Sequence, residues 1–249
     1  MGKTFEALMR AEQDRRLRHE EMAPFDLKVK LQPYAPVRLS VSQQVSEEYQ
    51  GLKHNLRSLL PETDSKILMF VSSKHGEGTS TVVAAFGTVL AKSGDNVLLV
   101  DANLRKPSLH DLFSVERAGG VNELLLGTTE VKDVTKKTRL RNLSIITGGI
   151  PTSNPSLAFN TKNVCHMIDG LKNGTDWILL DAPPVNEFTD AMALCPGIDG
   201  TVLVIQAEKT KWEVALRAKQ RLADTKTPVV GVVLNRRKYY VPGWLYRRL

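Results

Sequence analysis

The spacing of apolar residues changes character near Pro61. Before this residue, two stretches with apolar residues at helical spacing are separated by a segment that contains three prolines. The pattern predicts a helix over residues 2–22, an extended linker over 24–45 and an amphipathic helix over 46–60 that Pro61 ends.

From Lys66 onward, short apolar runs alternate with helical stretches. These runs are apolar on both faces, which is typical of parallel strands buried between helices. Right-handed crossovers then predict an α/β fold with one doubly wound, mostly parallel sheet, whose ligand site lies at the carboxyl ends of the strands. The predicted strands cover residues 67–73, 96–102, 143–149, 176–184, 200–206 and 228–235.

Composition narrows the class of protein. The chain has 249 residues, enough for one α/β core with short terminal extensions. It has two cysteines in unrelated contexts, five scattered histidines without metal-site spacing, and no apolar run approaching the ~20 residues that span a bilayer. The first residues lack the apolar centre of a signal peptide, so we expect a cytoplasmic protein.

The positive charge is concentrated at one end of the chain. The net charge is +7, and the last fourteen residues, 236–249, carry five basic side chains and no acid. Nucleic-acid binding proteins more often spread basic residues over a whole face, so we expect no nucleic-acid partner. These patterns divide the chain into an N-terminal helix and linker (1–45), an α/β domain (46–235) and a basic tail (236–249).

A glycine-bearing turn joins the first predicted strand to a helix. Such a turn directs backbone N–H groups and the helix dipole toward an anion. The phosphate-loop pattern ends in Gly-Lys-Ser/Thr, and here Gly78, Ser80 and Thr81 fit while Thr79 stands at the lysine position. The candidate nucleotide-binding residues are Lys74, Gly76, Glu77, Gly78, Thr79, Ser80 and Thr81.

Two later strands end in an aspartate. Asp101 closes the run 96–102, and Asp181 closes the apolar part of 176–184. Carboxylates leaving buried strands beside a phosphate loop are what a site for Mg²⁺ and a nucleotide requires.

Three stretches in this order resemble the bacterial tyrosine autokinases of capsule and exopolysaccharide synthesis, a P-loop family related to MinD and ParA. They are SSKHGEGTST, LLVDANLRKPSLH and DWILLDAPPV, which correspond to that family's Walker A, A′ and B motifs. The opening MGKTFEALMRAEQDRR is similar to a soluble subgroup that works beside a membrane chain-length protein. The resemblance implies ATP or ADP with Mg²⁺, a membrane polysaccharide co-polymerase as partner, homo-oligomers, and recruitment to the inner face of the plasma membrane.

The resemblance also implies residue roles. Ser80 would ligate Mg²⁺, Asp101 would lie near the metal and the attacking hydroxyl, and Asp181 would support the metal through water. Arg105 completes the catalytic set as the arginine of the Asp-x-Asp-x-Arg motif. The family's C-terminal tyrosine cluster corresponds to Tyr239, Tyr240 and Tyr246. The same basic and aromatic tail would also suit a membrane-surface contact, and both interpretations stay open.

Three departures from the family pattern bear on catalysis and assembly. Thr79 replaces the Walker A lysine, and Asn103 replaces the second acid of the A′ motif. The ring-forming motif Glu-x-x-Arg-x-x-Arg corresponds to Glu47, Gln50 and Lys53, which are therefore the candidate oligomer-interface residues.

The departures leave three functions open. The first is an active tyrosine autokinase, the second a nucleotide-responsive scaffold without useful kinase activity, and the third a partition-type ATPase. The tyrosine cluster argues against the third. We also hypothesise that Lys74, five positions before Thr79, partly supplies the missing positive charge.

Overall fold

The computed structural model describes residues 41–152, 154–172 and 174–238. The chain divides into two units, Met1–Ala35 and Pro36–Leu249, and every described residue belongs to the second unit. The predicted helix 2–22, residues 24–40 of the predicted linker and the three candidate tyrosines lie outside the described residues.

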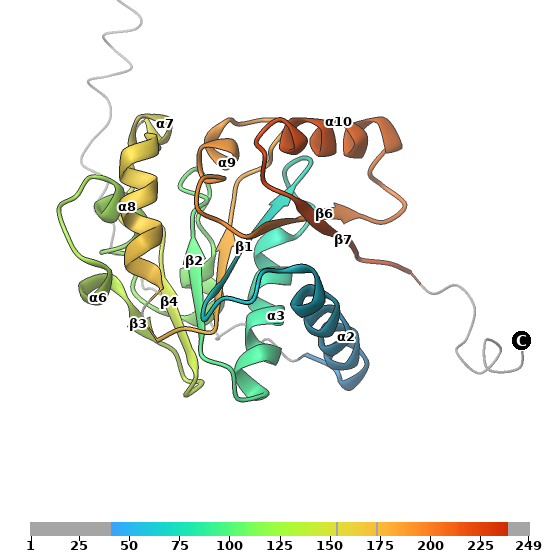
Figure 1. Cartoon of the computed structure of the whole chain (residues 1–249), viewed down its shortest axis with the longest axis horizontal. Helices are drawn as coiled ribbons and strands as arrows, with labels where there is room; N and C mark the ends of the chain where they lie inside the picture. Colours follow the sequence, from blue (N-terminus) through green and yellow to red (C-terminus); the bar gives the residue numbers. More distant parts are fainter. Residues whose placement is uncertain (1–40, 153, 173, 239–249) are drawn as a thin grey trace, which may run out of the picture. The chain divides into compact units, whose positions relative to one another are not determined.

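Within the described residues, seven strands form one sheet in the order β3-β4-β2-β5-β1-β6-β7 (Figure 1). All neighbouring strands are parallel except β3, which pairs antiparallel with β4. The sheet confirms the six predicted strands; the two-residue β3 was not predicted. The strands are β1 (Lys66–Ser72), β2 (Val97–Asp101), β3 (Lys136–Lys137), β4 (Leu143–Ile146), β5 (Trp177–Asp181), β6 (Gly200–Gln206) and β7 (Val229–Asn235).

Helices cover both faces of the sheet, which confirms the predicted α/β architecture. Helices α2 and α3 lie against one face, whereas α8 and α10 lie against the other (Figure 1). The described helices are α2 (Gln43–Leu59), α3 (Thr79–Lys92), α4 (Leu109–Phe113), α5 (Val121–Leu125), α6 (Val131–Val134), α7 (Pro155–Ala158), α8 (Thr161–Leu171), α9 (Asp190–Ala193) and α10 (Trp212–Ala223).

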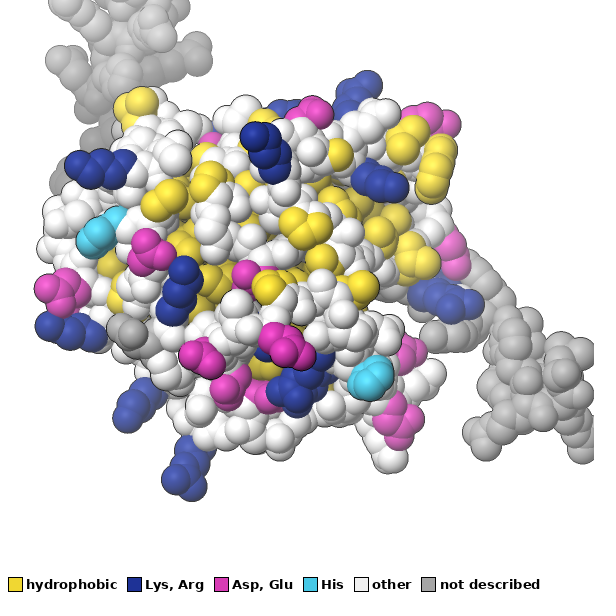
Figure 2. Space-filling model, viewed as in Figure 1, with side chains coloured by type: hydrophobic (Ala, Val, Ile, Leu, Met, Phe, Trp, Pro, Cys, Tyr) yellow, Lys and Arg dark blue, Asp and Glu magenta, His cyan; other side chains and the backbone are white. Residues whose placement is uncertain are grey.

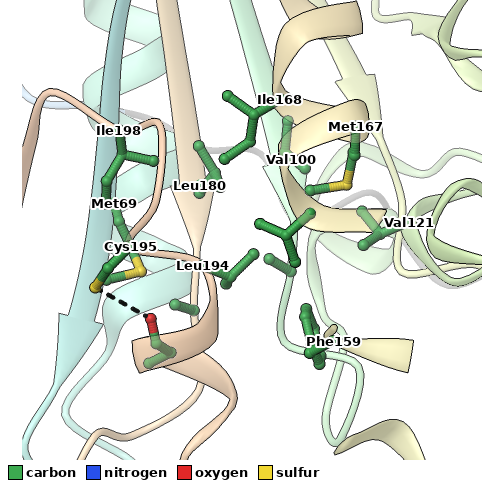
Figure 3. Packing of buried hydrophobic residues seen from close by; sticks show 14 of the residues in the cluster. Met69, Val100, Val121, Phe159, Met167, Ile168, Leu180, Leu194, Cys195 and Ile198 are labelled. Atoms are coloured by element: carbon green, nitrogen blue, oxygen red, sulfur yellow. Dashed lines mark hydrogen bonds between the residues drawn. The ribbon is translucent and has the colours of Figure 1, made fainter. Parts of the chain in front are cut away.

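Each strand contributes side chains to two separate cores because alternate residues point to opposite faces. In β1, Met69 packs into the core under α8, while Phe70 packs into the core under α2 and α3. Figure 3 shows the first core, where Leu180 and Val100 from neighbouring strands face Ile168 of α8. Burying each such side chain stabilises the fold by about 1.5–3 kcal/mol. The sheet is therefore held from both sides, and its strand ends are fixed in position.

Helix α2 begins at Gln43, three residues before its predicted start. The Ser42 hydroxyl accepts a hydrogen bond from the Val45 N–H at 3.4 Å and so caps the helix. The helix ends at Leu59, in agreement with the stop predicted at Pro61. Its Tyr49 ring lies 5.7 Å from the Phe86 ring of α3, and burial raises the pKa of Tyr49 to about 12. The predicted boundary between residues 45 and 46 stays a prediction.

Exposed apolar side chains gather at one edge of the sheet. On the face shown in Figure 2, hydrophobic side chains lie over the region of α10, β6 and β7. The exposed large hydrophobic residues of these elements are Trp212, Leu216, Val232 and Leu234. Of the helices that the structure describes, none combines the length and the apolar character needed to cross a membrane.

Candidate functional site

The candidate site lies where β1 turns into α3. The turn contains Gly76 and Gly78, whose φ angles of 87° and 91° lie in the left-handed region that favours glycine. A Cβ on Gly78 would also collide with the side-chain amide of Asn235, the last residue of β7. Helix α3 begins directly afterwards at Thr79, so its free N–H groups and the positive end of its dipole face the turn.

The Glu77 side chain shapes the loop from inside. Its buried carboxylate accepts hydrogen bonds from the Ser73 N–H at 2.7 Å, the Ser73 hydroxyl at 2.8 Å and the Lys74 N–H at 3.1 Å. The Thr210 hydroxyl donates a further bond to it, and the Asn235 side-chain N–H donates to the Glu77 carbonyl at 2.8 Å. Because the Glu77 carboxylate already accepts hydrogen bonds within the chain, the group that Glu77 can offer to a phosphate is its backbone N–H.

Asp101 and Asp181 lie side by side at the floor of the site. They are paired residues on the adjacent strands β2 and β5, and both are completely buried. One Asp101 oxygen, Oδ2, accepts hydrogen bonds from the Ser108 and Leu109 N–H groups, both at 2.9 Å. The other Asp101 oxygen and both Asp181 oxygens are buried and make no hydrogen bond to any described residue. Three carboxylate oxygens therefore lack a partner.

Burial perturbs both carboxyl groups. It raises the pKa of Asp101 to about 7, although the backbone N–H groups of Leu109 and Ser108 oppose the rise. Burial, followed by the negative charge of Asp101, raises the pKa of Asp181 well above its usual value, and the nearby Ser80 hydroxyl partly opposes this rise. Two adjacent buried carboxylates cannot both stay ionised unless a cation lies beside them.

The donor set fits a hard divalent cation. Mg²⁺ prefers carboxylate, hydroxyl and water oxygens, and here the Asp181 carboxylate, paired with Asp101, lies near the Ser80 hydroxyl at the start of α3. No group of three or more His, Cys, Asp or Glu side chains suited to a metal occurs among the described residues. These residues would therefore suit a divalent cation held by a few protein oxygens better than an all-protein metal cage.

A cavity of about 450 Å³ opens beside this pair; neighbours of the two aspartates, such as Asn103 and Ala182, line it, but Asp101 and Asp181 do not. Its walls come from the loop and start of α3, from residues 103–112 after β2, and from residues 182 and 184 after β5. The lining residues are Ser72, His75, Gly76, Gly78, Thr79, Ser80, Thr81, Asn103, Lys106, Pro107, Ser108, Asp111, Leu112, Ala182 and Pro184. The cavity thus brings together five of the predicted nucleotide-binding residues. Lys74 is described but does not line it.

A larger cavity, of about 800 Å³, lies elsewhere on the described surface. It is lined by residues near the amino ends of β2 and β4 and by α8, and none of its lining residues belongs to the phosphate loop. The chemistry of the molecule points to the smaller cavity, because parallel sheets bind ligands at their carboxyl ends.

Arg105 is engaged away from the loop. Its Nε donates to Asp190 at 2.7 Å, one of its terminal nitrogens donates to the Ser156 hydroxyl at 2.6 Å, and its guanidinium lies 4.0 Å from the centre of the Phe188 ring. Asp190 is almost fully buried. The assignment of Arg105 to catalysis stays a prediction, and sequence reasoning missed its partner Asp190.

The predicted interface residues of α2 make contacts within the chain. Lys53 forms an ion pair of 2.5 Å with Asp95, and the Gln50 side chain donates to the Ser93 hydroxyl at 2.5 Å. Glu47 accepts a hydrogen bond from Gln43 at 3.2 Å. Two of the three residues thus hold α2 against the end of α3; their role in an oligomer stays a prediction.

Comparisons with known proteins agree with this geometry. Residues 64–244 match the ParA family model, described as NUBPL iron-transfer P-loop NTPase. The tyrosine-protein kinase YwqD of Bacillus subtilis is 32% identical over 193 residues, which cover 78% of this chain and 81% of that protein. The tyrosine-protein kinase CpsD of Streptococcus agalactiae is 27% identical over 200 residues, covering 80% and 86%.

A solved structure gives the same result. The crystal structure of the chimerical protein CapA2B2 superposes with a TM-score of 0.73 at 27% identity and covers 84% of this chain and 88% of that chain. The similarity therefore extends from the sequence to the fold. The chain belongs to the bacterial tyrosine autokinase family, a branch of the P-loop NTPases related to ParA.

Proposed function

We propose that the chain binds ATP or ADP together with Mg²⁺ in the 450 Å³ cavity beside the β1–α3 loop. The observation that carries the proposal is the group of three buried, unpartnered carboxylate oxygens on Asp101 and Asp181 at the start of α3. Burying these oxygens is costly unless a cation lies beside them. A nucleotide phosphate bound to that cation would accept hydrogen bonds from the N–H groups at the start of α3.

Each part of the site then has a role in holding the nucleotide. The loop N–H groups and the dipole of α3 would bind the phosphates, and Ser80, Asp101 and Asp181 would hold Mg²⁺. The bound metal would neutralise charge on the phosphates during transfer. The resemblance also implies that Asp101 would lie near an attacking hydroxyl.

We further propose that the protein acts in capsule or exopolysaccharide synthesis from the cytoplasmic side of the membrane, beside a membrane co-polymerase. The resemblance to bacterial tyrosine autokinases supports this, as does the likeness to a chimera that joins CapA2 and CapB2. Homo-oligomers would form through α2, and the basic tail would present its tyrosines to a neighbouring site. The tail starts beside the loop, because Asn235 bonds to Glu77.

A second function is favoured by Thr79, which stands where the Walker A lysine is expected. Thr79 is 8% exposed and lines the cavity, but its hydroxyl carries no positive charge. Losing one positioned donor at a charged transition state costs roughly a hundredfold or more in rate. A nucleotide-responsive scaffold with weak or no kinase activity is therefore the alternative to an active kinase.

Calorimetry tests the binding proposal. ATP and ADP should bind the purified chain in the presence of Mg²⁺, and chelation of the metal should weaken binding. Asp181→Asn should remove most of the metal dependence, whereas Asp169→Asn, which alters an exposed pair with Lys172, should not. Folded protein that binds neither nucleotide at millimolar concentration would refute the proposal. Phosphotyrosine mapping by mass spectrometry then separates the kinase from the scaffold.

A further inference from the structure

A lysine outside the loop also lines the phosphate cavity. Lys106 lines the cavity from the segment after β2, and its Nζ lies 3.2 Å from Nε2 of His75 in the loop. Lys74, the other lysine near the loop, has its backbone N–H bonded to Glu77 but does not line the cavity. The same cavity is therefore lined by a positively charged residue and by Thr79, which carries no charge.

We propose that Lys106, carried on the A′ segment, is the phosphate-binding cation of this site and replaces the Walker A lysine that Thr79 lacks. This inference rests on the proposed nucleotide binding and names one residue that would contact the phosphates. It also assigns to Lys106, instead of Lys74, the positive charge that compensates for Thr79.

The backbone around Lys106 is fixed at both ends. The Lys106 N–H donates to the Asn103 side-chain oxygen at 3.2 Å, which closes a turn. Pro107 packs so closely on Gly148 that a Cβ there would lie 2.7 Å from the proline. The next two N–H groups bond to Asp101, a proposed metal-binding residue. These contacts hold in place the backbone from which the Lys106 side chain extends.

The contact with His75 leaves the ammonium ready for an anion. A lysine ammonium only donates hydrogen bonds, so Nε2 of His75 is the acceptor in this contact. No carboxylate of a described residue lies within ion-pair distance of Lys106. Phosphate oxygens would therefore replace a neutral acceptor by a charged one, which forms the stronger hydrogen bond. The His75 backbone is itself held, because its N–H donates to Glu187 at 2.8 Å.

The second departure in the motifs agrees with this assignment. Asn103 stands where the family pattern has an acid, and it lines the same cavity as Lys106. Its amide oxygen caps the turn without placing a negative charge in the wall, so it does not compete with a phosphate for the lysine. Asp111 also lines the cavity, but its carboxylate lies 3.5 Å from His110 and its side chain is 80% exposed. The loop thus lacks a positive charge at Thr79, and the segment after β2 lacks a negative charge at Asn103.

One other cation approaches the loop. A terminal nitrogen of Arg236 lies 3.9 Å from the position that a Cβ on Gly78 would occupy, on the side of β7. Arg236 is not among the residues that line the cavity, whereas Lys106 is. The experiment must therefore compare Lys106 with Arg236 and with Lys74.

The test measures the affinities of ATP, ADP and adenosine by calorimetry in the presence of Mg²⁺. Lys106→Gln should weaken ATP and ADP binding by about ten- to a hundredfold, the effect expected for one charge-assisted hydrogen bond. Lys106→Arg should keep most of the affinity, and Lys162→Gln, which changes an exposed lysine of α8, should bind like the wild type. Adding Thr79→Lys to Lys106→Gln should restore binding. Adenosine lacks phosphates, so its affinity should not change in any variant.

The outcomes separate this inference from the proposed function. If the folded wild type binds no nucleotide, the proposed function fails. If the wild type binds but Lys106→Gln binds ATP as well as Lys162→Gln does, the function stands and the assignment of Lys106 is wrong. An equal loss for adenosine would show a structural effect and overturn the assignment, and so would a loss confined to Lys74→Gln or Arg236→Gln. Circular dichroism and thermal unfolding establish that each variant is folded.

Discussion

The buried aspartate pair should make the metal-free protein less stable as the pH rises. A carboxyl group whose pKa is higher in the folded state holds its proton after the unfolded chain has lost it, so stability falls with pH. The pKa of Asp101 rises from 3.8 to about 7, which places the loss between these two values. Above pH 7 the contribution of Asp101 levels off. Asp181 changes stability in the same direction, since its pKa is also raised.

The size of the effect follows from Asp101 alone. A shift of roughly three pKa units corresponds to about 4 kcal/mol of destabilisation at alkaline pH. Integrated between about pH 5 and about pH 8, the loss is about 3 kcal/mol, an upper value because water and ions reduce it. Asp101→Asn removes the charge but keeps an oxygen that can accept the N–H groups of Ser108 and Leu109. The variant should therefore match the wild type more closely in acid and exceed its stability at about pH 8.

Urea unfolding followed by circular dichroism measures this difference at the two pH values. Asp169→Asn, on the surface of α8, is the control and should follow the wild type. Mg²⁺ with ADP should stabilise the wild type at about pH 8 and stabilise Asp101→Asn much less. The reasoning would be refuted if the wild type and Asp101→Asn kept a constant difference in unfolding free energy across the pH range.

Three further predictions concern the loop, the tail and α2. Gly78→Ala should abolish nucleotide binding because the new methyl group meets Asn235. Gly76→Ala has open space around the methyl group and should cost only about 1 kcal/mol of backbone strain. Calorimetry and urea unfolding compare the two variants, and equal effects would contradict the steric argument. Any phosphorylation should fall on Tyr239, Tyr240 or Tyr246, and mass spectrometry that finds phosphate chiefly on the half-buried Tyr49 would show otherwise. Asp95→Asn should destabilise the fold by about 1–3 kcal/mol, because it breaks the ion pair with Lys53 that anchors α2; an unchanged urea midpoint would mean that α2 is held by its apolar contacts alone.

Most of the fold followed from patterns local in the sequence. Strands that are buried on both faces must be apolar throughout, so six of them could be recognised without any knowledge of their neighbours. The exception was β3, since two lysines carry no apolar pattern and pair with β4 only because the chain returns beside it. The start of α2 was missed by three residues for a similar reason: the Ser42 cap lies outside the apolar stripe.

From the sequence alone we could predict that aspartates end two of the strands and that glycines form the turn after the first strand, because strand ends and turns depend on residues close together in the chain. Only the tertiary structure decided which of these residues meet. Strand order brought Asp101 beside Asp181, and long-range packing turned Arg105 toward Asp190 and placed Thr210 against the Glu77 carboxylate. Side-chain direction depends on contacts between segments far apart in the chain. For that reason Lys106, from the segment after β2, faces the phosphate cavity, while Lys74, within the loop, does not line it.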